Sequence, residues 1–154
     1  MVDPEKVRQG KKYRAAGNRF QSRVREDLEE EGWIVFRNSN DVEFSEKMDD
    51  CLRELPLGGE IPCGMFKQAK TKWVYNPVIH RRIPIGMSSG FPDFICIKKL
   101  FGEFEVQFVE SKMTGELDRE EKDKIEWIKN NLKIPVIIAS KGEKRGEIIY
   151  EHFL

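Results

Sequence analysis

Histidine and cysteine are scarce in this chain of 154 residues, and their scarcity argues against one class of metal site. There are two histidines, His80 and His152, and three cysteines, Cys51, Cys63 and Cys96, with no Cys-x-x-Cys pair. A structural zinc site needs four such ligands at suitable spacing. We therefore expect no zinc site, and we expect Cys96, which lies inside an apolar segment, to be a small core residue.

Long apolar runs are also missing. No stretch is long enough to cross a bilayer as a helix. The opening residues are polar, beginning with Pro4, Glu5 and Lys6, and do not resemble a secretion signal. We therefore expect an intracellular, cytoplasmic protein with reduced thiols and no membrane partner.

A net charge is lacking as well, because 27 basic residues balance 27 acidic ones. The distribution is uneven. Residues 1–25 carry eight basic and two acidic residues, residues 26–60 carry three and twelve, and residues 61–82 carry five and none. Two basic blocks in a neutral chain fit a partner with phosphates, because local fields matter more than net charge. The alternative is that the two basic blocks are solvated faces of the protein without a partner.

Apolar periodicity divides the chain into helices and strands. Phe20, Val24 and Leu28 form one stripe of a helix predicted over residues 18–31, with Asn18 as its N-cap and Gly32 as its stop. A second helix is predicted over residues 41–55. Strands are predicted at 33–37, 93–98, 104–112, 135–139 and 147–151, with strand pieces in 65–86 and a helix from 117 to 132.

This mixed order predicts an α/β fold, of α+β type, in which a mixed sheet is flanked by helices. The length suits one domain. We expect a single domain over residues 1–154, with a basic N-terminal arm at 1–16, either extended or a frayed helix, and an insert at 38–89.

The segment GFPDFICIKKLFGEFEVQFVESK, residues 90–112, places charges in apolar strands. An antiparallel hairpin turning near Phe101 and Gly102 pairs residues whose numbers sum to about 203. Asp93 then faces Glu110, and Lys112 joins them on the same face because side chains alternate along a strand. The sequence thus predicts two carboxylates and an amine at one end of the hairpin.

Two carboxylates that face each other repel, so they need a compensating charge. A divalent cation supplies it, and Mg²⁺ is often held by one or two carboxylates together with water and phosphate. Lys112 would then orient a water molecule or meet a phosphate oxygen, which is the chemistry of phosphodiester hydrolysis. An ion-pair cluster with only a structural role is the alternative.

These residues resemble a known family. Pro92-Asp93 followed by Glu110-Ser111-Lys112 resembles the PD-(D/E)xK nuclease superfamily. The segments GFPDFI, FVESK, the Leu-Asp-x-Glu-Glu helix start and IPVIIASK look like the VRR-NUC type. GNRFQSRVREDLEEEGWIVFR, residues 17–37, is similar to the first helix and strand of archaeal Holliday-junction resolvases.

The resemblance implies a restriction-endonuclease-like core, dependence on Mg²⁺ or Mn²⁺, and cleavage of DNA. It implies that Asp93 and Glu110 hold the metal and that Lys112 serves the attacking water. Gln21 stands where relatives usually have a catalytic glutamate, and it brings no charge. Glu26 is a rival for that role, although we expect it to be solvated. Relatives often have glutamine near Glu121.

Further residues are candidates for contact with DNA. Basic side chains beside Trp73 and Tyr75 would bind phosphates while the rings stack on an exposed base, although an ordinary sheet extension also explains them. We expect Lys122 and Lys124, on the helix after the motif, to be solvated. The DNA-contact candidates are Arg19, Arg23, Lys67, Lys70, Lys72, Trp73, Arg81, Arg82 and Ser89.

Three functions remain open from the sequence. The first is a metal-dependent DNA endonuclease, with branched, flapped and four-way DNA among the substrates considered. A four-way junction needs two coordinated cuts, which favours a homodimer. The second is a DNA-binding module of nuclease fold without turnover, because of Gln21. The third is an interaction protein in which Asp93, Glu110 and Lys112 form only ion pairs.

Overall fold

A computed structural model describes residues 4–44, 53–54, 60–61, 64–70, 73–84 and 90–153 of the chain. The predictions for Lys72, Ser89, Cys51 and Cys63, and for residues 45–52 of the second helix, lie outside these ranges. No helix of the described residues is long and apolar enough to cross a membrane.

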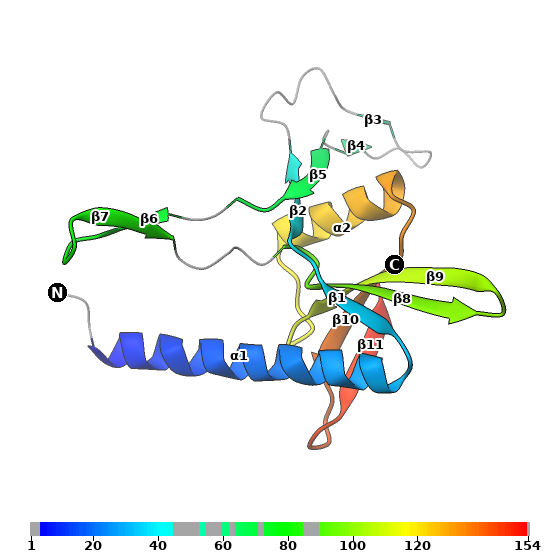
Figure 1. Ribbon diagram of the computed structural model, residues 1–154, viewed down its shortest axis with the longest axis horizontal. Coiled ribbons are helices and arrows are strands. Elements are labelled where there is room, and N and C mark those ends of the chain that lie inside the picture. Colours follow the sequence, from blue (N-terminus) through cyan, green and yellow to red (C-terminus); the bar gives the residue numbers. More distant parts are fainter. Residues whose placement is uncertain are drawn as a thin grey trace.

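A five-stranded mixed sheet forms the centre of the fold (Figure 1). Its order is β1-β8-β9-β10-β11, where β9 and β10 are parallel and the other neighbours are antiparallel. The bounds are β1 Ile34–Arg37, β8 Phe94–Leu100, β9 Glu103–Ser111, β10 Val136–Lys141 and β11 Ile148–His152. The predicted mixed sheet is therefore confirmed, as are its predicted strands.

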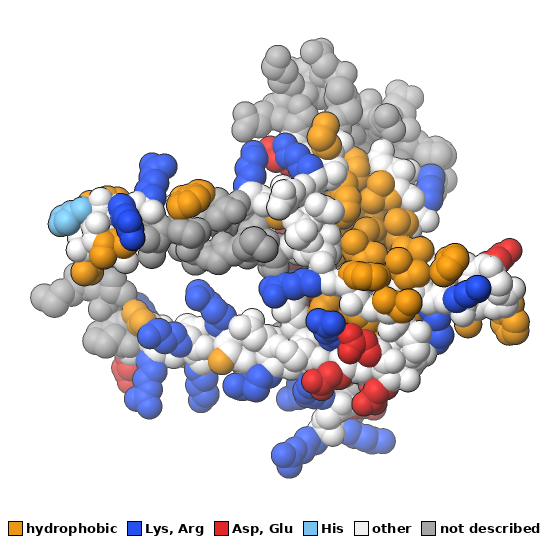
Figure 2. Space-filling view, in the orientation of Figure 1, with side chains coloured by type: hydrophobic (Ala, Val, Ile, Leu, Met, Phe, Trp, Pro, Cys, Tyr) orange, Lys and Arg blue, Asp and Glu red, His pale blue; other side chains and the backbone are white. Residues whose placement is uncertain are grey.

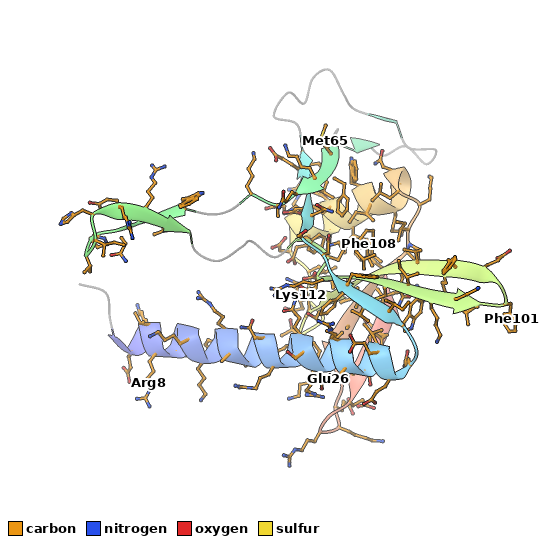
Figure 3. All side chains as sticks on the ribbon, viewed as in Figure 1. Arg8, Glu26, Met65, Phe101, Phe108 and Lys112 are labelled. Carbon is orange, nitrogen blue, oxygen red and sulfur yellow. The ribbon has the colours of Figure 1, made fainter. Side chains whose placement is uncertain are left out.

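Two helices cover opposite faces of this sheet. Helix α1, Pro4–Glu30, packs Phe20, Val24 and Leu28 against one face, where Cys96 is buried as expected. Helix α2, Arg119–Asn131, buries Ile125, Trp127 and Ile128 against the other face, which includes Phe108 of β9 (Figure 3). Each helix buries one apolar stripe, as a 3.6-residue period requires.

The hairpin of β8 and β9 has the predicted register. Ile95 pairs with Phe108 and Ile97 with Val106. The turn places Phe101 and Gly102 at positive φ, 49° and 92°, which is the backbone of a type I′ turn. The alternation of the two strands and this turn together fix which side chains share a face.

Helix α1 differs from the prediction at its start. It begins at Pro4, so the predicted N-cap at Asn18 is wrong, and most of the basic arm is helical. Its end is as predicted. Gly32 has φ 89° and donates to the Glu29 carbonyl, while Trp33 donates to Leu28, which is the Schellman pattern.

The predicted second helix over residues 41–55 is wrong at residues 41–44 and 53–54, which the structure describes as strands. Residues Asn40–Phe44 form β2, which pairs with β5, Gly64–Gln68, and residues Arg53–Glu54 form β3, which pairs with β4, Glu60–Ile61. A third small sheet joins β6, Trp73–Asn76, to β7, Arg81–Pro84. Pairing with a distant strand overrides local helical spacing.

Candidate active site

The open end of the β8–β9 hairpin gathers the three predicted charged residues. The strand pairing ends at Phe94 and Val109, and the next amide, that of Asp93, donates to Glu110 Oε2 at 3.0 Å. Lys112 Nζ lies 3.6 Å from Glu110 Oε1. The structure therefore brings Asp93, Glu110 and Lys112 together.

Ser111 fixes the carboxylate of Asp93. Both the amide and the hydroxyl of Ser111 donate to Asp93 Oδ2, the amide at 3.0 Å. These two bonds fall on one oxygen, and among the described residues no hydrogen bond reaches Oδ1. Ser111 was not among the site residues predicted from the sequence, although its place between Glu110 and Lys112 was a usable signal.

Of the three side chains in the cluster, Glu110 lies in the environment least favourable to an ionised group. It is 6% exposed. Burial and the neighbouring charge of Asp93 raise the pKa of Glu110 to about 8, against the opposing effect of Lys112. Burial also raises the pKa of Asp93, although its hydrogen bonds to Ser111 oppose the shift. Two buried carboxylates this close need additional positive charge to ionise together.

Lys112 has a second carboxylate partner, which the sequence analysis did not assign. Its ammonium pairs with Glu121 Oε1 on α2. Glu121 Oε2 accepts from the Asp118 amide, and Asp118 accepts from the Glu121 amide, so a capping box holds Glu121 in place. Burial lowers the pKa of Lys112, but Glu121 and Glu110 outweigh burial and raise it.

Asn38 holds the loop that carries Asp93. It is buried, its side-chain amide donates to the carbonyls of Pro92 and Asn40, and its Oδ1 accepts from the Asn40 amide. Its own backbone amide donates to the Asp93 carbonyl at 2.8 Å. Asparagine in a polar stretch carries no pattern that sequence reasoning could have used to find this role.

Gly90 in the same loop serves close packing of backbone. A Cβ there would lie 2.2 Å from the Asn40 carbonyl oxygen and 2.6 Å from the Asn40 nitrogen. Glycine is required here because the backbone of Asn40 fills the space that a side chain would need.

The residues of α1 are less closely tied to the cluster. Gln21 is half-buried, and no hydrogen bond or ion pair among the described residues joins it to Asp93, Glu110 or Lys112. Glu26 is exposed, as expected, and lies on α1 apart from Lys112 (Figure 3). Arg19 is exposed, whereas Arg23 donates to the Gly146 carbonyl at 2.7 Å.

The remaining basic candidates fall into two groups. Lys67 and Lys70 are paired with Glu43 at 2.7 and 2.6 Å, and they line a cavity of about 440 Å³ beside α2. Lys124, expected to be solvated, instead pairs with Asp41 and Glu120 across that cavity. By contrast, Arg81 and Arg82 are exposed on the hairpin that also carries the exposed Trp73.

The donor set fits a hard divalent cation better than zinc. The described residues contain no group of three or more histidine, cysteine, aspartate or glutamate side chains that could hold a metal. Asp93 and Glu110 nevertheless offer two carboxylates, and Mg²⁺ is often held by that number with water and phosphate completing its shell. Such an ion would bind Asp93 Oδ1 and the carboxylate of Glu110.

Comparison of the chain with protein-family models, curated proteins and solved structures found no match.

Proposed function

We propose that this chain is a metal-dependent deoxyribonuclease that hydrolyses phosphodiester bonds, with Asp93 and Glu110 as ligands of Mg²⁺ or Mn²⁺. The observation that supports the proposal most is the convergence of Asp93, Glu110 and Lys112 at one end of a hairpin. When bound, the ion supplies a Lewis acid and lowers the pKa of a bound water. The restriction-endonuclease-like core is part of the same proposal.

The roles of the chain's own residues follow from their environments. Ser111 and the Asp93 amide hold the two carboxylates in fixed orientations. The raised pKa of Lys112 keeps its amine protonated at neutral pH, so it acts as a positive hydrogen-bond donor and not as a base. A protonated amine beside the carboxylates stabilises the negative charge that develops on a phosphate oxygen.

The test is cleavage of plasmid, linear, flapped and four-way DNA by the whole chain with Mg²⁺ or Mn²⁺. We expect Asp93→Asn and Lys112→Ala to lower the cleavage rate by about 10³-fold or more, in keeping with the loss of catalytic groups, and a chelator to stop it. Glu103→Gln, an exposed acid at the other end of the same hairpin, is the matched control and should cleave normally. Unchanged cleavage by Asp93→Asn would refute the assignment.

A second function is favoured by Gln21, which brings no carboxylate. On this reading the chain binds DNA in a salt-sensitive way and does not cut it. A Gln21→Glu variant that gains cleavage would support the second function, whereas multiple turnovers by the wild type would exclude it.

A further inference from the structure

The N-terminal half of α1 takes no part in the core. Residues 5–15 are all exposed, and the buried stripe begins only at Phe20. At a rise of about 1.5 Å per residue, this half projects roughly 20 Å beyond the packed part of the helix. Figure 1 shows it extending away from the sheet. A helical extension without a packed face has a use other than supporting the core.

Positive charge dominates this half. Residues 6–25 contain eight basic residues and no acidic one. At about 100° per residue, Arg8, Lys12 and Arg19 fall within roughly 40° of one another and about 140° from the buried Val24. They form a stripe about 16 Å long on the face turned away from the core. Figure 2 shows Lys and Arg side chains along this helix.

No acidic side chain in the part of the chain that the structure describes neutralises these charges. None of the ion pairs between described residues involves Arg8, Lys12 or Arg19, in contrast to Lys67 and Lys70, which pair with Glu43. The half-helix also lacks the apolar face by which a helix lies on a membrane. An exposed stripe of unpaired cations without apolar surface matches the phosphates of a nucleic acid.

The β6–β7 hairpin carries a different surface. Trp73 and Tyr75 are 58% and 55% exposed, and they share one face of the ribbon because they are two residues apart. Arg82 pairs across the strands with Tyr75 and joins that face. Rings beside a guanidinium form a stacking platform for unpaired bases. In Figure 1 the hairpin projects from the body to the same side as the free half of α1.

We propose that these two elements form a nucleic-acid-binding fork separate from the Asp93 cluster. The stripe of Arg8, Lys12 and Arg19 binds the phosphates of a duplex, and the face of Trp73, Tyr75 and Arg82 stacks on bases that have left the duplex. The fork thus selects DNA in which a duplex passes into a single strand. As the substrate-selecting surface of a nuclease it rests on the proposed function, but its binding is measured without cleavage.

The test uses the full chain carrying Asp93→Asn, without metal, and three labelled DNAs: a duplex, a single strand, and a duplex with a single-stranded tail. We expect the tailed duplex to bind most tightly. Arg8→Glu with Lys12→Glu should weaken binding to both duplex-containing DNAs by tenfold or more and reduce the salt slope of log K by about 2. Trp73→Ala with Tyr75→Ala should weaken the tailed duplex and the single strand about tenfold and leave the plain duplex unchanged.

The matched control is Lys144→Glu with Arg145→Glu, which makes the same charge change at the exposed β10–β11 turn and should have a smaller effect. Equal weakening by this control, or an unchanged salt slope in the α1 variant, would overturn the α1 contact. Equal weakening of all three DNAs by the aromatic variant would overturn the stacking role. Circular dichroism verifies folding, and Arg8→Gln with Lys12→Gln provides a milder second variant that should give a smaller change in the same direction.

The two proposals fail separately. A wild type that binds through the fork but never cuts with any metal defeats the nuclease and leaves the fork intact. Equal cleavage rates for the wild type and for variants that carry the fork substitutions would defeat the role of the fork in substrate selection and leave the nuclease proposal intact.

Discussion

At the scale of single residues, the Glu110 carboxyl makes the stability of the folded protein depend on pH. Its carboxyl is buried beside Asp93, and its pKa is raised to about 8. In the unfolded chain this carboxyl has its ordinary pKa of 4.5, whereas in the folded chain it stays protonated up to a higher pH. Stability from this group therefore falls as pH rises from about 4.5 to about 8.

The substitution Glu110→Gln should remove this loss of stability at higher pH. Glutamine keeps an oxygen to accept from the Asp93 amide and has no charge to bury. With a chelator present, we expect the variant to be more stable than the wild type by a few kcal/mol at pH 8, and by much less at pH 5. Urea unfolding at both pH values measures the difference.

Added Mg²⁺ should affect the wild type and the Glu110→Gln variant differently. An ion held by Asp93 and Glu110 should raise the melting temperature of the wild type in proportion to its binding to the folded state, and should raise that of Glu110→Gln much less. An equal rise in both proteins would contradict the assignment of Glu110 as a ligand.

At the scale of elements, what could be predicted from the sequence depended on local pattern. The β8–β9 register followed from alternating apolar residues around Phe101 and Gly102, and the end of α1 followed from Gly32. The start of α1 was missed because its exposed half has no apolar period for periodicity to detect. Residues 41–44 were misassigned because β2 is held by β5 and by the Asp41–Lys124 pair, 83 residues apart in sequence.

The same dependence on local pattern explains which residues of the candidate site could be predicted. Asp93, Glu110 and Lys112 could be placed together since one hairpin carries all of them. Asn38 and Glu121 could not, because their contacts join separate elements of the fold to that hairpin.

Two glycines should respond to alanine in opposite directions. Gly90→Ala places a Cβ against the backbone of Asn40 and should destabilise the protein by roughly 2–4 kcal/mol. Gly17→Ala, in α1 with no heavy atom within 4 Å of the new Cβ, should stabilise it by about 0.5–1 kcal/mol. Thermal unfolding of the two variants checks both signs. Stabilisation by Gly90→Ala would show that the loop before Asp93 is packed differently.

At the scale of the whole molecule, one face of the sheet is only partly covered. Ile34 and Phe36 on β1 and Phe104 on β9 point to the side on which α2 packs, yet they are exposed. Figure 2 shows hydrophobic side chains gathered on this surface. Contiguous exposed apolar surface is unusual for a monomeric protein, which makes its consequences measurable.

Replacing Phe36 and Phe104 by serine should reduce the binding of a hydrophobic dye to the native protein several-fold. Both side chains are more than half exposed, at 52% and 69%, so we expect the free energy of unfolding to change by about 1 kcal/mol or less. Dye fluorescence alongside urea unfolding separates the two effects. Strong dye binding that persists in the double variant would place the apolar surface elsewhere. The homodimer that cleavage of a four-way junction would favour stays a prediction.

The two-residue turn between β8 and β9 has a consequence for how this chain can change over time. All three charged residues of the cluster lie within twenty positions of one another, on a single supersecondary unit. Lengthening, shortening or exchanging the distant segments between β2 and β8 leaves their mutual spacing intact. Changes in those segments can therefore remodel the surface of the protein while the geometry of the three charged side chains is inherited unaltered.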